Sequence, residues 1–342
     1  MRPRGGGRVT IRDVAQEAGV SRQTVSRVVN GDPRVSQETR ESVRRAIETL
    51  RFQPNYIARS LATRRTDTIG FIVSDIGNPF FPDILAGAED VLGEQGCSLF
   101  LSNTRDDPDR EYAALRSMVR KRVDGIILYS RMPDAMLDGL VQSFEIPTVL
   151  LNRRGKGEHL GVVRTARLQG AYQAASHLRS LGHTEIALVC STSNEQGTRE
   201  RIEGYESALR EAAGQAEPRV LRESLSMGGG YRAGCHLLEA YRDVTGVLCH
   251  NDLMAIGLVQ AATERGLRVP RDLSVIGWDD VTYASLVSPP LTTVRVPRYE
   301  MGKVAARLLM DLMQQRPGER EAMLPVELVV RGSCGPRRLS GA

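Results

Sequence analysis

The stretch GVSRQTVSRVVNG, residues 19–31, carries side chains that could read a nucleic acid. Its apolar residues, Val25, Val28 and Val29, recur at helical spacing and would bury one face of a helix. The other face is polar, and its hydrogen-bonding residues are Arg22, Gln23, Thr24, Ser26 and Arg27. Arginine can bind guanine through two hydrogen bonds, and glutamine can pair with adenine. The residues alone leave open whether this face is solvated or lies against DNA bases.

Two helices and a short turn would position this face. Thr10 and Asp13 form a capping pair ahead of an apolar run that closes at Gly19, as a helix with a glycine C-cap would. Ser21 is a suitable N-cap for the next helix. The turn of about three residues makes the helices cross sharply, as in a helix-turn-helix. A third amphipathic helix begins near Ser36, so we expect a small helical domain over 9–54, after a flexible basic tail at 1–8.

Positive charge is concentrated at the amino-terminal end of the chain. The first 65 residues hold 14 Arg and no Lys against six acidic residues, a net charge of +8. Because the whole chain carries +5, the remainder carries −3. A basic end joined to a mildly acidic body is typical of a polyanion-binding surface confined to one module.

Residues 55–66 follow Pro54 and have a helical pattern with few apolar neighbours. A lone helix of about ten residues is marginal in water, because its nucleation cost is not offset. The segment is therefore either a plain linker or a helix that folds only against a partner.

From Thr68 onward, short apolar β-rich runs alternate with helical segments. Near-continuous apolar strands between helices predict parallel sheets covered on both faces. The pattern occurs twice, which predicts an α/β core at 67–335 made of two doubly wound subdomains. The first is expected at about 67–163 plus 296–325, the second at about 164–293 plus 328–335, with a tail at 336–342.

Several protein classes are disfavoured by the sequence. No apolar run approaches the roughly 18 residues of a membrane span, and the start MRPRGGGRVT lacks the apolar segment of a secretory signal, so we expect a cytoplasmic protein with no membrane partner. The five cysteines and five histidines show no metal-ligand spacing. GGGYRAG lacks the lysine and hydroxyl residue of a phosphate-binding loop. We expect no enzyme activity, no cofactor and no metal.

The segment VTIRDVAQEAGVSRQTVSRVVNG resembles the DNA-binding signature of the LacI/GalR family of bacterial transcription regulators. The resemblance continues through NPFF, KRVDGIIL, LGHTEIALV, RIEGY, NDLMAIG, VPRDLSVIGWDD and SPPLTTVRVP, and covers residues 9 to 335. It implies an all-α helix-turn-helix bundle with a hinge helix, followed by a periplasmic-binding-protein-like core of two doubly wound parallel-sheet subdomains.

For DNA, the resemblance makes the helix after Ser21 a recognition helix. Arg22, Gln23 and Arg27 occupy the family's base-reading positions, whereas hydroxyl residues suit capping or phosphate contact. Residues 55–63 resemble the hinge helix, and Leu61 stands at the position of a minor-groove leucine wedge. Paired hinges imply a homodimer on a pseudo-palindromic operator, with a tetramer left open. The residues expected at DNA are Thr10, Ser21, Arg22, Gln23, Thr24, Ser26, Arg27, Asn30, Tyr56, Ala58 and Leu61.

For the core, the resemblance implies a small-molecule effector in the cleft between the subdomains. The expected ligand-binding residues are Asn78, Phe80, Phe81, Arg164, Arg201, Asn251, Asp279 and Arg298. Asp252 could contact ligand, or it could be a helix N-terminal carboxylate stabilised by the dipole. For Trp278, core packing is favoured over ligand contact.

Departures from the family pattern bear on the class of effector. VVRTARLQG presents Arg164 and Arg167 instead of a usual Asp-Asn pair, and Arg298 and Leu225 stand where sugar-binding relatives often carry aromatics. Arginines suit carboxylate or phosphate groups better than neutral hydroxyls. The sequence therefore predicts an anionic effector, such as a sugar acid or a phosphorylated sugar.

The combined expectation is a repressor of a catabolic operon, controlled by a sugar or sugar-derived molecule. Whether that molecule releases the protein from DNA or acts as a corepressor depends on which closure state fits DNA. The alternative is a solute-binding protein of the same core fold acting in transport. The helix-turn-helix and the absence of a signal segment at residues 1–10 disfavour it.

Overall fold

The computed structural model describes residues 9–29, 31–52, 65–143, 145–193, 195–211 and 217–337. The chain divides into two compact units, residues 1–66 and 67–342. Within the described part, no helix is both long enough and apolar enough to cross a membrane.

The first unit is a bundle of three helices. They are α1 (Ile11–Glu17), α2 (Arg22–Val29) and α3 (Gln37–Leu50). Val14, Val25 and Val43 are fully buried at their junction, one from each helix. The amphipathic spacing of these helices thus forms the small core that the sequence predicts.

Local signals set the helix ends in this unit. The Thr10 N–H donates to the Asp13 carboxylate at 2.7 Å, and this hydrogen bond lowers the pKa of Asp13. Gly19 follows α1 with a φ of +66°, a left-handed conformation that glycine adopts without strain. The Thr24 N–H donates to Ser21 Oγ at 3.1 Å, so Ser21 caps α2. The predicted helix-turn-helix is confirmed.

The second unit contains two six-stranded sheets. In spatial order, the strands of the first sheet are β11 (Glu321–Leu324), β5 (Leu160–Thr165), β4 (Thr148–Leu151), β3 (Gly125–Leu128), β1 (Thr68–Val73) and β2 (Ser98–Asn103). All neighbouring strands pair in parallel. The helices of this subdomain are α5 (Phe81–Glu94), α6 (Pro108–Lys121), α7 (Asp134–Ser143) and α13 (Arg298–Met313).

The second sheet has the same winding with one reversed edge strand. Its strands are β12 (Glu327–Val329), β10 (Thr292–Arg295), β9 (Ser274–Asp279), β8 (Gly246–Cys249), β6 (Ile186–Ser191) and β7 (Arg219–Glu223), and only β12 runs antiparallel to its neighbour. The helices around it are α8 (Arg167–Ser180), α9 (Gln196–Arg210), α10 (Met227–Ala240), α11 (Asp252–Glu264) and α12 (Thr282–Leu286).

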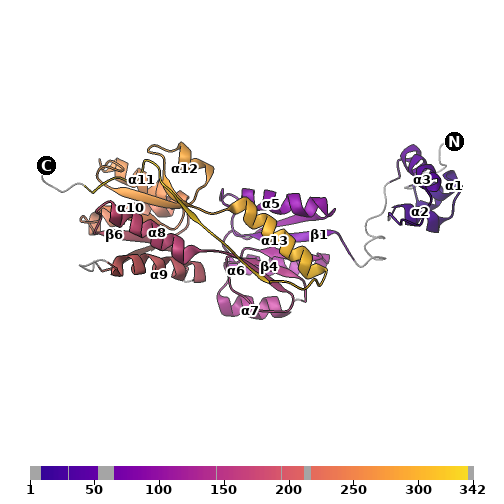
Figure 1. Cartoon of the computed structure of the whole chain (residues 1–342), viewed down its shortest axis with the longest axis horizontal. Helices are drawn as coiled ribbons and strands as arrows, with labels where there is room; N and C mark the ends of the chain where they lie inside the picture. Colours follow the sequence, from indigo (N-terminus) through magenta and orange to yellow (C-terminus); the bar gives the residue numbers. More distant parts are fainter. Residues whose placement is uncertain are drawn as a thin grey trace. The chain divides into compact units, whose positions relative to one another are not determined.

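The chain passes between the two sheets more than once. It leaves the first sheet after Thr165, returns after Arg295, and crosses again between β11 and β12 (Figure 1). Strand β5 runs to Thr165, so it extends past the subdomain boundary expected at residue 163. The predicted pair of parallel-sheet subdomains is confirmed. The connections join them at one side of each sheet, where a cleft between the two can form.

Two glycines let α5 and α13 approach closely. A Cβ atom on Gly87 would lie 2.0 Å from the Tyr299 backbone oxygen, and one on Gly302 would lie 2.0 Å from the Ile84 backbone oxygen. Figure 1 shows the two helices side by side on the first sheet. Because backbone atoms cannot yield as a flexible side chain can, any larger residue must push the helices apart.

Gly87→Ala is therefore expected to lower the free energy of unfolding by about 1–3 kcal/mol, as overpacking does. Urea unfolding followed by far-ultraviolet circular dichroism measures the change. Gly93→Ala is the matched control, because it makes the same substitution in α5 with no atom within 4 Å of the new Cβ. It should be neutral, or stabilising by up to about 1 kcal/mol. Equal effects of the two variants would refute the close-packing argument.

Candidate functional site

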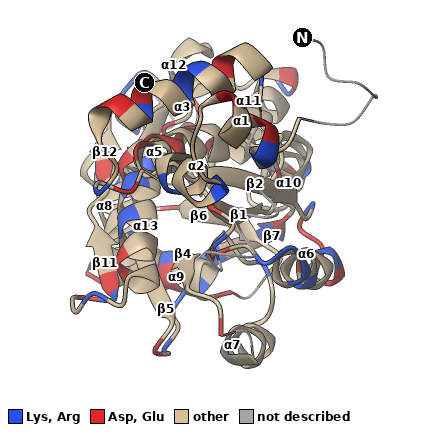
Figure 2. Ribbon diagram, turned by 90° about the vertical axis from the view of Figure 1, so that its right-hand side faces the viewer, with Lys and Arg blue, Asp and Glu red and all other residues tan. Residues whose placement is uncertain are grey.

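The polar face of α2 is available to a partner. Arg22, Gln23 and Arg27 are exposed, whereas Val25 and Val28 face the bundle core. The helix contains two arginines and no acidic residue. By contrast, acidic and basic segments are interspersed along core elements such as α6 (Figure 2). A short helix whose exposed side chains are arginine and amide groups can donate hydrogen bonds to base edges and phosphates.

The other residues expected at DNA differ in what the structure gives them to do. Ser21 and Thr24 bond each other through their hydroxyls at 2.9 Å, consistent with a capping role. Arg27 lies 3.9 Å from Asp32, a carboxylate that also pairs with Arg34 at 2.8 Å. Thr10 caps α1 through Asp13. Asn30, Tyr56, Ala58 and Leu61 lie outside the described residues, so the hinge helix stays a prediction.

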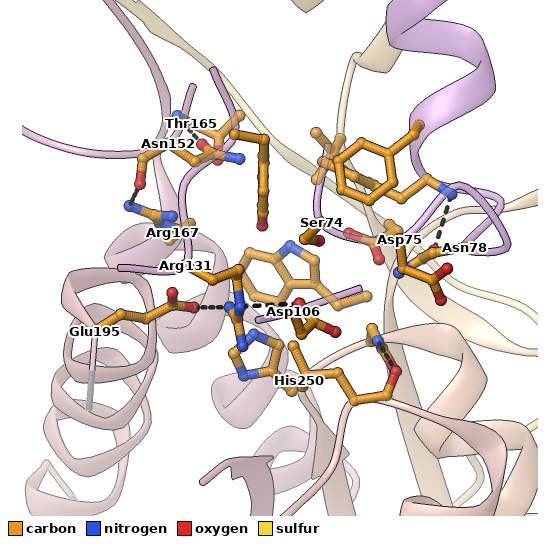
Figure 3. Close-up of a pocket in the computed structure, with 18 of the residues that line it drawn as sticks. Ser74, Asp75, Asn78, Asp106, Arg131, Asn152, Thr165, Arg167, Glu195 and His250 are labelled. Carbon is orange, nitrogen blue, oxygen red and sulfur yellow. Dashed lines mark hydrogen bonds and ion pairs between the residues drawn. The ribbon is translucent and has the colours of Figure 1, made fainter. Parts of the chain in front are cut away.

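A small cavity lies between the two sheets of the second unit, with about 50 Å³ of space for water-sized molecules. It is lined from the ends of strands in both sheets, as ligand sites in open α/β folds are. Figure 3 shows its side chains converging from the two subdomains. The lining residues are Ser74, Asp75, Asn78, Phe80, Phe81, Asp106, Tyr129, Arg131, Asn152, Thr165, Arg167, Glu195, Arg201, Leu225, His250, Asn251, Trp278, Asp279 and Val296.

Aromatic side chains form one wall of this cavity. Phe81 packs edge-on against Phe80 and Tyr129, with ring centroids 5.3 and 5.0 Å apart. Asn78 sets the turn that presents them, because its Oδ1 accepts the Phe80 N–H at 3.0 Å. Burial raises the pKa of Tyr129, so its hydroxyl stays neutral. This wall offers apolar faces and hydroxyl or amide groups rather than charge.

Arg201 is a buried cation at the cavity. Its guanidinium lies over the Trp278 ring at 4.4 Å, and its Nη1 donates to the Gly197 carbonyl at 3.2 Å. Its Nε has no hydrogen-bond partner, and Arg201 makes no ion pair with any residue that the structure describes. Burial, with the nearby charge of Arg167, lowers the pKa of Arg201 to about 10, so it remains charged at neutral pH. Buried charges are normally paired, so this one favours an anionic ligand.

Two further arginines line the cavity and are already paired. Arg167 donates to Glu200 at 2.9 Å and to the Asn152 carbonyl at 2.9 Å. Arg131 forms an ion pair with Glu195 across the cleft (Figure 3) and lies 3.3 Å from Asp106. Burial opposes the charge of Arg131, but the Glu195 carboxylate raises the pKa of that guanidinium above its usual value.

Burial shifts the pKa of two other titratable groups in the lining towards their neutral forms. Burial, reinforced by the Asp252 carboxylate, raises the pKa of Asp279 well above its usual value. Burial and the neighbouring arginines lower the pKa of His250 well below its usual value. His250 is therefore neutral at neutral pH, and the positive charge of the lining resides on its arginines.

Two of the residues expected to bind ligand lie elsewhere in the structure. Arg164 and Arg298 lie outside the cavity lining. Arg164 pairs with Glu200 at 2.6 Å, and Arg298 pairs with Asp83 at 2.6 Å and donates to the Asp279 carbonyl. Both arginines are thus paired with carboxylates of the protein. The arginines of the lining are instead those already described.

The structure also shows the contacts of three residues that could have either a ligand-binding or a structural role. Asn251 lines the cavity, but its Oδ1 caps α11 by accepting the Met254 N–H at 2.8 Å. Asp252 is fully buried outside the lining and accepts bonds from Thr293 and the Val281 N–H, so it is structural. Trp278 is 1% exposed, yet it also forms cavity wall, so core packing and site formation coincide.

Sequence reasoning missed several lining residues. They are Ser74, Asp75, Asp106, Tyr129, Arg131, Asn152, Thr165, Glu195, His250 and Val296. Three of them directly follow a parallel strand: Ser74, Tyr129 and His250. Ligand sites in such folds form at the ends of strands. The ends of the apolar runs in the sequence mark these strand ends, but they do not indicate which strand ends lie together in the fold.

Comparison with known proteins agrees with both units. Residues 10–55 match the family described as bacterial regulatory proteins, lacI family, and residues 175–334 match a periplasmic binding protein-like domain. The chain is 38% identical over 304 residues to the HTH-type transcriptional repressor PurR of Haemophilus influenzae (strain PittEE), which covers 88% of this chain and 90% of that one.

Solved structures match over nearly the whole chain. The Lac repressor dimer bound to operator and the anti-inducer ONPF superposes with a TM-score of 0.85 and 30% identity, covering 96% of this chain and 100% of that one. A transcriptional regulator CelR–cellobiose complex gives a TM-score of 0.72 and 33% identity, covering 95% and 100%.

A helix-turn-helix unit joined to an α/β core with a cavity between two sheets defines a DNA-binding transcriptional repressor with a small-molecule site. The chain belongs to the LacI family of bacterial regulatory proteins. The relatives that it matches along both units are transcriptional regulators, which favours regulation over enzyme catalysis or solute transport.

Proposed function

We propose that this repressor controls a catabolic operon in response to an anionic, sugar-derived molecule bound in the cavity between the two sheets. The observation that carries the ligand class is Arg201, a buried guanidinium with an unpartnered Nε and no ion pair among the described residues. A carboxylate or phosphate would supply the missing partner with charge-assisted hydrogen bonds. The CelR–cellobiose complex among its structural relatives supports a sugar-derived ligand.

The rest of the lining supports a sugar-like body on this anion. Asn78, Ser74 and Thr165 offer groups that hydrogen-bond hydroxyls, and Phe81 offers an apolar face. The residues proposed to bind the effector are Asn78, Phe80, Phe81, Arg201, Asn251 and Asp279, joined by Arg131 and Arg167. Arg164 and Arg298 are left out because neither lines the cavity.

A mobility-shift assay tests this function. The operator is first selected from random-sequence DNA by the unaltered protein, and its binding is then measured with glucose, gluconate or glucose 6-phosphate. The two anions should change operator affinity by about fivefold or more, a usual allosteric coupling, and glucose should not. Arg201→Met should abolish the response while operator binding persists. A response to glucose alone would contradict the anionic ligand class.

On DNA, we propose that Arg22, Gln23 and Arg27 contact base edges, and that Thr10, Ser21, Thr24 and Ser26 position the helix. Two copies of the chain are proposed to read a pseudo-palindromic site, as half-site recognition by helix-turn-helix dimers requires. The core also has separate exposed apolar side chains, such as Phe100 on β2 and Leu286 on α12, that are available for self-association. Sedimentation at the concentration that saturates the operator tests the dimer, and a monomer there would contradict it.

A further inference from the structure

Glu195 places a carboxylate of the protein itself on the cationic side of the cavity. Its Oε1 accepts a hydrogen bond from Arg131 Nη1, and its Oε2 lies 3.8 Å from Arg153 Nη1. Both arginines follow strands of the first sheet, whereas Glu195 immediately precedes α9 of the second subdomain. The side chains of Arg131 and Glu195 are each 9% exposed. This ion pair therefore joins the two subdomains inside the cleft.

The first subdomain holds Arg131 firmly in that position. The main-chain N–H of Arg131 donates to Glu111 Oε2 at 2.9 Å, and the Nε of the Arg131 side chain lies 3.3 Å from Asp106 Oδ1. Its Nη2 also reaches the second subdomain, where it donates to Ser191 Oγ at 3.2 Å. The guanidinium is thus fixed at the cavity, and the group that can change is the carboxylate facing it.

The same pair leaves little room for a ligand. The cavity offers about 50 Å³, whereas ligand pockets usually measure about 300–1,000 Å³. Figure 3 shows Arg131 and Glu195 extending toward each other across it. Movement of a lining group would enlarge this space for a sugar-sized molecule, and Glu195, which precedes α9, can move without disturbing a strand.

We propose that Glu195 is a built-in competitor for the anionic group of the effector. In the unliganded protein it neutralises Arg131 and ties the subdomains together. An incoming carboxylate or phosphate replaces it on Arg131, and Glu195 turns to solvent. The inference rests on the proposed anionic effector, and it adds both a specificity device and a route by which binding alters the contact between subdomains.

Charge balance explains why this exchange selects anions. When an anion takes the place of Glu195, Arg131 stays paired and the displaced carboxylate regains its hydration. If a neutral ligand displaced Glu195, the buried Arg131 would keep only its ion pair with Asp106 among the described residues, and the loss of the Glu195 contact would be unfavourable. The neighbouring contacts of α9 do not take part, because Gln196 accepts the Arg154 N–H at 3.0 Å and Glu200 pairs with Arg164. Helix α9 keeps these contacts while the Glu195 side chain, just before the helix, moves away from Arg131.

Calorimetric titration of the full chain with inorganic phosphate tests the proposal. Glu195→Gln should bind phosphate about tenfold more tightly than the unaltered protein, because the internal competitor for a charge-assisted contact is gone. Glu203→Gln is the matched control: it makes the same substitution on an exposed residue of α9 and should leave phosphate affinity unchanged. Glu195→Gln combined with Arg131→Met should lose the response, which places phosphate in this cavity.

The possible results separate the inference from the proposed function. Equal phosphate affinity in the unaltered protein, Glu195→Gln and Glu203→Gln would overturn the competition while leaving an anion site intact. No phosphate binding to any of them would overturn both. If Glu195→Gln does not fold, Glu195→Asp replaces it: the shorter carboxylate reaches Arg131 less well, so its phosphate affinity should lie above that of the unaltered protein. An unchanged value for Glu195→Asp would then refute the competition.

Discussion

Arg22→Ala is expected to weaken binding to the selected operator by roughly 10- to 100-fold while leaving binding to unrelated DNA nearly unchanged. One bidentate arginine–guanine contact contributes about 1–3 kcal/mol of discrimination, which corresponds to this range. Arg22 is the first residue of α2 and is exposed, so its loss removes no core contact. The expected change is therefore in sequence reading and not in folding.

Fluorescence anisotropy with operator and scrambled duplexes at one salt concentration measures this discrimination, because both affinities vary steeply with salt. Arg44→Ala is the control, since it removes the same charge from an exposed position on α3 of the same unit. Any loss of affinity that Arg44→Ala causes should be the same for the operator and the scrambled duplex. If Arg22→Ala also lowered the affinity for both duplexes equally, Arg22 would contact a phosphate and not a base.

The second large effect expected is a gain in stability of the core at mildly acidic pH that depends on Asp252. Burial raises the pKa of this carboxyl to about 7, against a usual value near 3.8, although hydrogen bonds from Thr293 and Val281 partly oppose the shift. Between about pH 4 and pH 7 the folded state therefore holds a proton that the unfolded state has lost. Lowering the pH favours the state that binds more protons, so stability rises as pH falls through 7.

From about pH 8 to about pH 5, this one group should add about 3 kcal/mol to the free energy of unfolding, at about 1.4 kcal/mol per unit of pKa difference. Urea unfolding followed by tryptophan fluorescence measures it, because Trp278 is the single tryptophan of the chain and lies in the core. Asp252→Asn cannot ionise, so the pH-dependent difference between the two proteins reports the ionisation of Asp252 together with its effect on the pKa of Asp279. Ion-paired carboxyls such as Glu200 have a lowered pKa, so they titrate below this window. Parallel pH profiles for the two proteins would disprove the buried ionisation.

The helix-turn-helix was predictable from sequence because its determinants are local. Thr10 and Asp13 cap a helix within four residues of chain, and Gly19 ends it with a positive φ. The valines of α2 mark its buried face by spacing alone, which leaves Arg22 and Gln23 on the outside. The alternation of apolar runs and helices likewise predicted two parallel sheets, since each strand shows its burial in its own residues.

The cavity was predictable only in part. Asn78, Phe81, Arg201, Asn251 and Asp279 are in the lining as expected. The sequence could not show which arginines are available to a ligand, because each of the others pairs with a carboxylate that is distant in the chain. Arg164 pairs with Glu321, 157 residues later, and Arg298 pairs with Asp83, 215 residues earlier.

The sequence by itself determined that this chain has a helix-turn-helix with an arginine-bearing polar face and two doubly wound subdomains. Those properties depend on residue spacing and on the chemistry of single side chains. Only the tertiary structure decided which lining arginine, Arg201, makes no ion pair with a described residue, and which carboxylate, Glu195, extends into the cleft. The physical reason is that ion pairing acts over a few ångströms, so it follows the meeting of distant segments and not their order in the chain.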